Sequence, residues 1–102
     1  MEVSISKFFL EQLDKCPIKF QKDFRKIYQQ FKIVDSPLEI KGVEKYLTNK
    51  KHFKLTIDKS KIIMKVDKEI LQIACFLYNQ YFVKQRYKQP ILLLMIELVI
   101  FI

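Results

Sequence analysis

Residues 52–78 have the sequence HFKLTIDKSKIIMKVDKEILQIACFLY, and this stretch decides the fold. Apolar and polar side chains alternate along it, which is typical of strands with one buried face. Two short polar segments, Asp58-Lys59-Ser60 and Asp67-Lys68-Glu69, interrupt the alternation and suit tight turns. Consecutive strands joined by such short turns run antiparallel. The stretch therefore predicts a three-stranded antiparallel meander.

The alternation also predicts that the two faces of this meander differ. One face would be apolar and would pack on helices. Its members are Phe53, Leu55, Ile57, Ile62, Met64, Val66, Leu71, Ile73, Cys75 and Leu77. The other face would carry Lys54, Thr56, Lys61, Lys65, Gln72 and Tyr78, with Ile63, Ala74 and Phe76 among them. This second face is expected to be a cationic surface with an aromatic ring at its border.

The residues before the meander predict a short strand and two helices. Val3 and Ile5 alternate with polar neighbours, as in a strand, and residues 5–13 then follow helical spacing up to Cys16-Pro17. Pro17 can occupy the first turn of the second helix, where its missing N–H costs nothing. That helix carries an apolar stripe opposite a charged side, and the stripe is expected to face the core. The stripe consists of Phe20, Phe24, Ile27, Tyr28 and Phe31.

The segment that leads into the meander is harder to assign. Asp35-Ser36-Pro37 is expected to end the second helix, because the residue before a proline resists helical geometry. Residues 38–48 then form either a short strand or a loop. The chain as a whole predicts an α+β domain: an N-terminal strand, a two-helix hairpin and an antiparallel meander packed on the helices.

Charge is concentrated in one part of the chain. The net charge is +8 over 102 residues, and residues 41–68 contain nine basic and three acidic side chains. Such a local field attracts phosphate backbones, acidic partner segments or anionic membrane surfaces. The alternative is a lysine-rich solvated face with no binding role.

Cysteine and histidine content excludes several classes of site. Cys16 and Cys75 lie far apart and match no disulfide or zinc framework, and the chain has a single histidine. We therefore expect two buried, reduced thiols and neither a metal site nor a cofactor. No long apolar run follows Met1 to Lys7, so no signal peptide is expected and the protein is predicted to be cytoplasmic.

The order of elements and several short motifs resemble the RelE/ParE superfamily of type II toxins. Ile40-Lys41-Gly42-Val43 is similar to the segment that precedes the family's meander, and residues 52–57 are similar to its next strand. Asp58 to Met64 and Val66 to Ile70 resemble the two motifs that follow. The resemblance covers residues 2–84 and places a toxin domain at 1–88. It implies a toxin that cuts messenger RNA on the ribosome and is neutralised by a cognate antitoxin.

The resemblance also implies candidate site residues, with departures from the family pattern. The two family arginines of the meander fall on Lys54 and Lys61, and the terminal motif falls near Tyr78 without its His or Arg. Lysine supplies positive charge to a phosphate but lacks the bidentate fork of arginine. Tyr78 and His52 are the candidates for proton transfer, and His52 either reaches the rim of the basic face or is an exposed strand-end residue.

Further basic and aromatic residues extend the candidate site. Lys50, Lys51, Lys65, Lys84 and Arg86 are expected to contact nucleic acid. A separate set of aromatic residues could either stack on unpaired bases or close the end of the core. This set consists of Tyr78, Tyr81, Phe82 and Tyr87.

An apolar segment at 89–102 lies beyond the length of the resemblance. The apolar run 91–102 is twelve residues long and includes the charged Glu97. It is therefore shorter than the ~20 apolar residues that a helix needs to span a bilayer. The segment could be a buried strand or helix, a homodimer contact, a surface covered by the antitoxin, or a weak membrane contact. An uncovered segment of this kind would promote aggregation, so we expect something to cover it.

Three functions follow from these patterns. The first is a ribosome-dependent messenger RNA endoribonuclease. The second is a non-catalytic protein of the same fold that binds an antitoxin or inhibits DNA gyrase, which the missing family Arg and His favour. The third is a membrane-surface protein held by residues 91–102 and the basic face.

Overall fold

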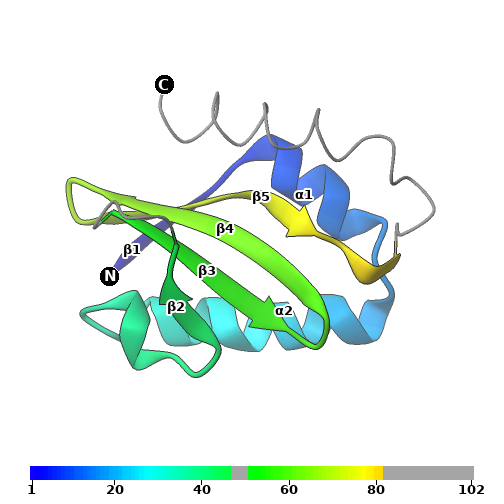
Figure 1. Ribbon diagram of the computed structural model, residues 1–102, viewed down its shortest axis with the longest axis horizontal. Coiled ribbons are helices and arrows are strands. Elements are labelled where there is room, and N and C mark those ends of the chain that lie inside the picture. Colours follow the sequence, from blue (N-terminus) through cyan, green and yellow to red (C-terminus); the bar gives the residue numbers. More distant parts are fainter. Residues whose placement is uncertain (47–50, 82–102) are drawn as a thin grey trace.

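The computed structural model describes residues 1–46 and 51–81 (Figure 1). Within these ranges a short strand is followed by two helices and then by four strands. The elements are β1 (Glu2–Ile5), α1 (Lys7–Asp14), α2 (Ile18–Phe31), the 3-10 turn η1 (Pro37–Glu39), β2 (Val43–Lys45), β3 (His52–Ile57), β4 (Ser60–Asp67) and β5 (Ile70–Tyr78). The predicted α+β class, with its N-terminal strand, two helices and antiparallel meander, is confirmed.

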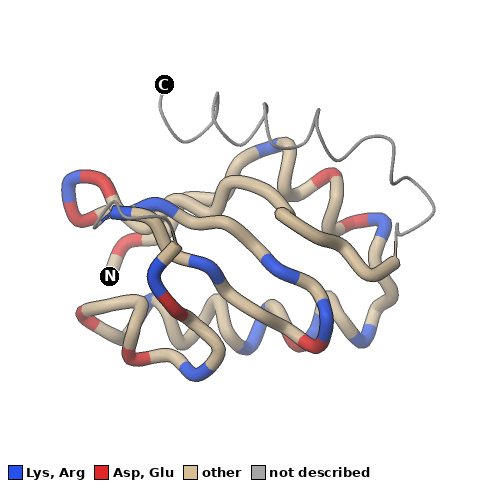
Figure 2. The backbone as a smooth tube through the Cα atoms, in the orientation of Figure 1, with Lys and Arg blue, Asp and Glu red and all other residues tan. Residues whose placement is uncertain are grey.

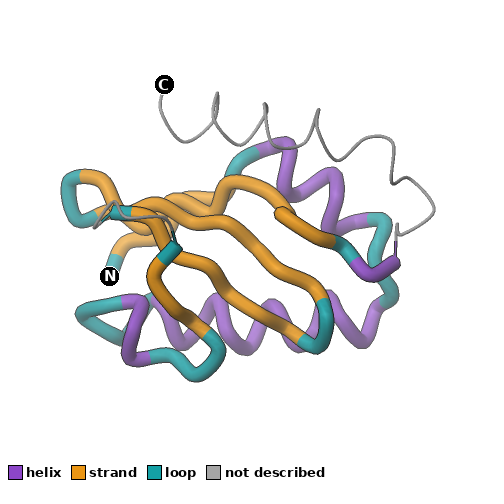
Figure 3. Tube along the Cα trace, viewed as in Figure 1, coloured by secondary structure: helices purple, strands orange, loops and turns teal. Residues whose placement is uncertain are grey.

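The described strands form one mixed sheet in the order β1-β5-β4-β3-β2. β3, β4 and β5 are the predicted antiparallel meander, β1 pairs with β5 in parallel, and β2 pairs antiparallel with β3 at the other edge. The described part of the segment 38–48, residues 38–46, therefore contains both of the alternatives that its sequence left open: loop residues and a three-residue strand, β2. Figure 3 shows α2 along one side of the sheet and α1 next to β5.

The two helices begin in different ways, and only α1 has a side-chain cap at its start. Ser6 caps α1, because its Oγ accepts a hydrogen bond from the backbone N–H of Phe9 at 2.9 Å. Pro17 is the N-cap residue of α2 rather than a residue of its first turn. α2 ends at Phe31, four residues before Asp35, so the expected end at Asp35-Ser36-Pro37 is wrong.

A capping box around Ser36 explains why the predicted end of α2 was wrong. Glu39 accepts hydrogen bonds from the backbone N–H groups of Asp35 and Ser36, at 3.0 and 2.8 Å. The side chain of Ser36 accepts from the backbone N–H of Leu38 at 3.3 Å. Ser36 and Pro37 thus begin the separate turn η1 and do not end α2.

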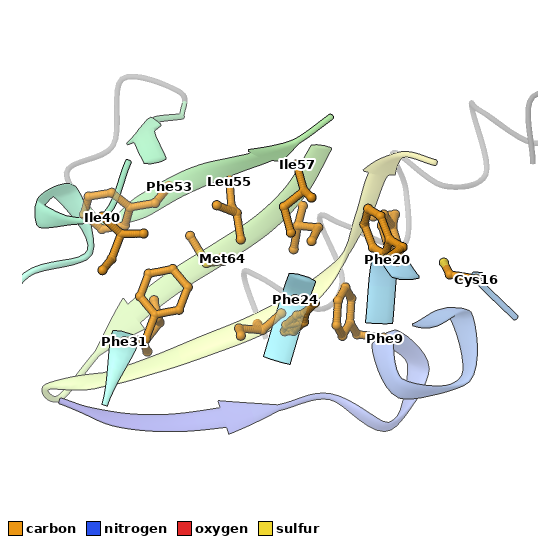
Figure 4. Packing of buried hydrophobic residues seen from close by; sticks show 14 residues of the cluster. Phe9, Cys16, Phe20, Phe24, Phe31, Ile40, Phe53, Leu55, Ile57 and Met64 are labelled. Carbon is orange, nitrogen blue, oxygen red and sulfur yellow. The ribbon is translucent and has the colours of Figure 1, made fainter. Parts of the chain in front are cut away.

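The main core lies between α2 and one face of the sheet (Figure 4). Phe20, Phe24 and Phe31 of the predicted stripe are buried there. Phe9 of α1 packs edge-on against Phe24 and stacks on Phe76, with both ring-centroid distances at 5.0 Å. Aromatic contacts therefore join both helices to β5.

The pairing of β4 with β5 shifts at two positions. Met64 pairs with Ile73, whereas the residue before it, Ile63, pairs with Cys75. Ala74 is therefore an extra residue on β5. A second shift between Ile62 and Lys61 makes Leu77 an extra residue in the same strand. Each extra residue reverses the alternation of side chains along the bulged strand.

These two bulges correct the predicted faces of β5. Phe76 lies in the main core with Phe9, although alternation placed it on the polar face. Cys75, predicted in the main core, instead joins Ile63 and Ala74 in a second cluster on the opposite face, and Leu77 packs against that cluster. The period-2 pattern fails here because it assumes a regular strand.

Both thiols are buried, as predicted. Cys16 is in the main core and Cys75 is in the second cluster, and neither forms a disulfide. Burial raises the pKa of the Cys75 thiol to about 12. Over residues 1–46 and 51–81, no helix is both long and apolar enough to cross a lipid bilayer.

Candidate nucleic-acid interface

The face of the sheet opposite α2 carries the predicted basic residues. Cross-strand pairs place Thr56 beside Lys61 and Lys61 beside Tyr78, while His52 lies beside Lys65. Lys54 lies between these two rows and faces Ile63 of β4. We call this surface, defined by Lys54, Lys61, Lys65 and Tyr78, the lysine face.

The lysine face has an apolar centre. Ile63 and Cys75, which pair with each other beside Lys54, have no exposed surface. Lys61 and Lys65 lie on either side of Ile63 along β4, and both are partly exposed. Figure 2 shows basic positions spaced along β3 and β4, with acidic positions at the turns and on β2. The lysines therefore frame a buried apolar strip instead of forming a continuous basic patch.

Lys54 already has an anionic partner. Its Nζ lies 3.0 Å from Oε1 of Glu44, the residue directly opposite it on β2. Sequence reasoning missed Glu44 because residues 38–48 were not assigned to a strand. An edge strand over Val43-Glu44-Lys45, paired with residues 53–55, would have placed this carboxylate beside Lys54.

His52 is buried, with 1% of its surface exposed, so the exposed strand end expected as one alternative is wrong. It lies at the edge of the lysine face, beside Lys65. Its backbone carbonyl accepts a hydrogen bond from the N–H of Tyr46 at 2.9 Å, which holds β3 against the residue after β2. Burial lowers the pKa of His52, and the positive charges of Lys65 and Lys51 lower it further. The lowered pKa disfavours the charged form of the imidazole, which lies on the same side of β3 as Lys54.

Contacts at the end of the meander fix Tyr78 relative to Lys61. Oε1 of Gln80 accepts a hydrogen bond from the backbone N–H of Lys59 at 2.8 Å. The backbone N–H of Gln80 donates to Oγ of Ser60 at 3.1 Å. These bonds connect the residues after β5 to the β3–β4 turn. The Lys61–Tyr78 pair therefore lies next to two hydrogen bonds that hold this end of the sheet together.

The remaining predicted residues divide into three groups. Lys51 is exposed, and its carbonyl accepts a hydrogen bond from the N–H of Val66 at 2.8 Å. The ring of Tyr81 packs edge-on against Phe20 at 5.5 Å, as expected for a residue that closes the core. Burial, followed by the negative charge of Asp58, raises the pKa of Tyr81. A third group lies outside the described residues and consists of Lys50, Lys84, Arg86, Phe82, Tyr87 and the segment 89–102.

The side chains of the described residues offer no obvious metal centre. In the two ranges that the structure describes, no three His, Cys, Asp or Glu residues are grouped so that they could hold a metal ion.

Comparisons with known proteins place the fold. No protein-family model matches the sequence. No curated protein matches it either. The structure is similar to a chain in the crystal structure of the RelB–RelE antitoxin–toxin complex from Methanococcus jannaschii, with a TM-score of 0.67 and 16% sequence identity. The match covers 83% of this chain and 95% of that chain. The chain therefore has a RelE-like fold.

Proposed function

We propose that the protein is the toxin of a type II toxin–antitoxin pair and cuts messenger RNA on the ribosome in the cytoplasm. The observation that carries this proposal is the placement of Lys54, Lys61 and Tyr78 on one face of a RelE-like sheet. A cognate antitoxin is the expected protein partner.

The proposed chemistry assigns separate roles to the two residues at the braced end of the sheet. Lys61 holds the scissile phosphate and stabilises the charge that develops on it during cleavage. Tyr78, its cross-strand neighbour, transfers a proton. Lys54, Lys65 and Lys51 contact neighbouring phosphates, and Lys50, Lys84 and Arg86 remain predicted contacts. His52, being buried, is proposed to position Lys65, its cross-strand neighbour.

Growth arrest tests the proposed site. Expression of the wild-type protein is expected to stop growth, and the double variant Lys54→Ala/Lys61→Ala is expected to abolish this arrest. The matched control is Lys19→Ala/Lys22→Ala, which removes the same charge from exposed positions on α2. A lysine-face variant that stays as toxic as the wild type rules out the proposed site.

Purified components test the reaction itself. Wild-type protein, programmed ribosomes and a defined messenger RNA are expected to give discrete cleavage products. The lysine-face double variant should give none, while the α2 control should cut normally. Uncut RNA with the wild-type protein would rule out the endoribonuclease activity.

The ion pair at Lys54 favours a second candidate, a non-catalytic protein of this fold. Glu44 already neutralises Lys54, and His52 is withdrawn from solvent, so fewer groups remain for phosphate chemistry. Such a protein would bind an antitoxin or inhibit DNA gyrase. Intact RNA together with arrested DNA supercoiling decides for gyrase inhibition, whereas cleaved RNA with normal supercoiling excludes it.

A further inference from the structure

The ion pair between Glu44 and Lys54 has an uneven exposure to solvent. The Glu44 side chain is 64% exposed, whereas that of Lys54 is 19% exposed. The carboxylate is therefore the more accessible partner, and the ammonium group is the more shielded one. A phosphate that approaches Lys54 from solvent encounters a lysine that already has a carboxylate 3.0 Å away.

The sheet fixes this arrangement. Glu44 and Lys54 are direct cross-strand partners in the β2–β3 pairing, and opposite charges in such pairs attract each other. On the other side of Lys54, the cross-strand residue is Ile63, which is apolar and fully buried. The short strand β2 thus brings an acidic side chain to the central lysine of the lysine face.

We propose that Glu44 sets the affinity of the lysine face for RNA phosphates by competing with them for Lys54. The inference rests on the proposed function, since it assumes that RNA is the ligand of this face. A partly exposed ion pair is weak, so its removal is expected to tighten RNA binding about two- to fivefold. Glu44 therefore tunes the interface and does not block it.

Binding of a fluorescein-labelled single-stranded oligoribonucleotide tests the inference. Fluorescence anisotropy over a range of KCl concentrations would compare the wild type with Glu44→Gln. The control is Glu11→Gln, which changes the net charge equally at an exposed position of α1. Lys54→Met and the double variant Glu44→Gln/Lys54→Met complete a mutant cycle.

The expected results are specific to the pair. Glu44→Gln should tighten binding about two- to fivefold and steepen the slope of log K against log salt by up to about 0.7, because one more lysine neutralises a phosphate. In a protein that already carries Lys54→Met, Glu44→Gln should change the affinity for RNA no more than Glu11→Gln does. Thermal melts check that each variant is folded, and Glu44→Thr replaces Glu44→Gln if the latter is unfolded.

Three other results would overturn the inference. Equal tightening by Glu44→Gln and Glu11→Gln, or tightening that persists without Lys54, assigns the effect to net charge and leaves the proposed function intact. A wild-type protein that does not bind the oligoribonucleotide at low salt overturns this inference, whereas the proposed function is overturned separately, by uncut messenger RNA on programmed ribosomes.

Discussion

Oε1 of Gln12 in α1 accepts a hydrogen bond from the backbone N–H of Phe76 in β5, at 3.1 Å. Phe76 lies between the two extra residues of β5, Ala74 and Leu77, where regular pairing with β4 is disrupted. The backbone N–H of Ser6 donates to the carbonyl of Ile73 at 3.0 Å, close to the first of these bulges. α1 and the residue before it therefore supply two hydrogen-bond partners to the irregular strand.

Gln12→Ala is expected to destabilise the protein by about 1–3 kcal/mol, because it leaves the partly buried N–H of Phe76 without its acceptor. Urea unfolding measures the loss, and hydrogen exchange should show faster exchange at the Phe76 amide. Gln12→Glu keeps a side-chain acceptor and should lose less stability. Gln29→Ala, at an exposed position of α2, should stay within about 0.5 kcal/mol of the wild type.

Gly42→Ala is expected to weaken the pairing of β2 with β3. Gly42 has a φ of +92°, and a Cβ added there would lie 2.9 Å from the carbonyl oxygen of Thr56. The Gly42 carbonyl also accepts a hydrogen bond from the N–H of Thr56 at 2.9 Å, so the backbone has little room to move. We expect a loss of about 1–3 kcal/mol in urea unfolding. Lys41→Ala, next to it and exposed, should leave stability unchanged.

Replacing Lys68-Glu69 by Asn-Gly is expected to stabilise the protein. Lys68 and Glu69 form the two-residue connection between β4 and β5, and both have left-handed φ values, 51° and 67°. Asn and Gly adopt this conformation with less strain than Lys and Glu, so a gain of about 1 kcal/mol is expected. The variant Lys68→Ala/Glu69→Ala removes the same charges without relieving the strain and should give no gain in urea unfolding.

Stability is expected to fall as the pH drops below about 6.5, because of His52. Burial lowers the pKa of His52, and Lys65 and Lys51 lower it further. The unfolded chain, with an ordinary histidine pKa near ~6.5, therefore binds a proton first as the pH falls. The resulting loss continues down to the lowered pKa of the folded state and is at most about 1.4 kcal/mol per pH unit.

Urea unfolding between about pH 5.5 and 7.5 measures this dependence, in a window above most carboxylate titrations. His52→Gln removes the titrating group, so its stability should vary little with pH in the same window. A wild-type protein whose stability is flat over this range would contradict a lowered pKa for His52.

Regular periodicity explains how much of the fold was predictable. The meander, the first strand and both helices follow from alternation and from the stripe that contains Phe20, Phe24 and Phe31. The reversed positions of Cys75 and Phe76 could not be predicted, because the bulges are fixed by tertiary contacts such as the bond from Phe76 to Gln12. The end of α2 was misjudged because Ser36 caps a separate turn.

The candidate site was predictable as a set of lysines on one face with Tyr78 at its border, but not in its other details. Local alternation places Lys54, Lys61 and Lys65 together, since β3 and β4 pair without a register shift. The partner of Lys54 depends on how β2 pairs with β3. β2 has only three residues, so the sequence gives a weak signal for this strand. Alternation within one strand does not reveal the burial of His52, because it places this residue on the side of β3 that carries Lys54.

Tyr78→Phe is expected to separate proton transfer from base stacking. Tyr78 lies directly opposite Lys61, so its hydroxyl is proposed to act next to the phosphate that Lys61 holds. Removing only the hydroxyl keeps the ring, and RNA binding should therefore remain within about twofold of the wild type, while cleavage should fall about 100-fold or more. Tyr81→Phe is the control, because its ring packs on Phe20 and has no proposed role in the reaction.

Single-turnover kinetics measure cleavage, and fluorescence anisotropy measures RNA binding, so the two effects of Tyr78→Phe are obtained separately. Undiminished cleavage by Tyr78→Phe would rule out proton transfer by this residue and leave base stacking as its only proposed role.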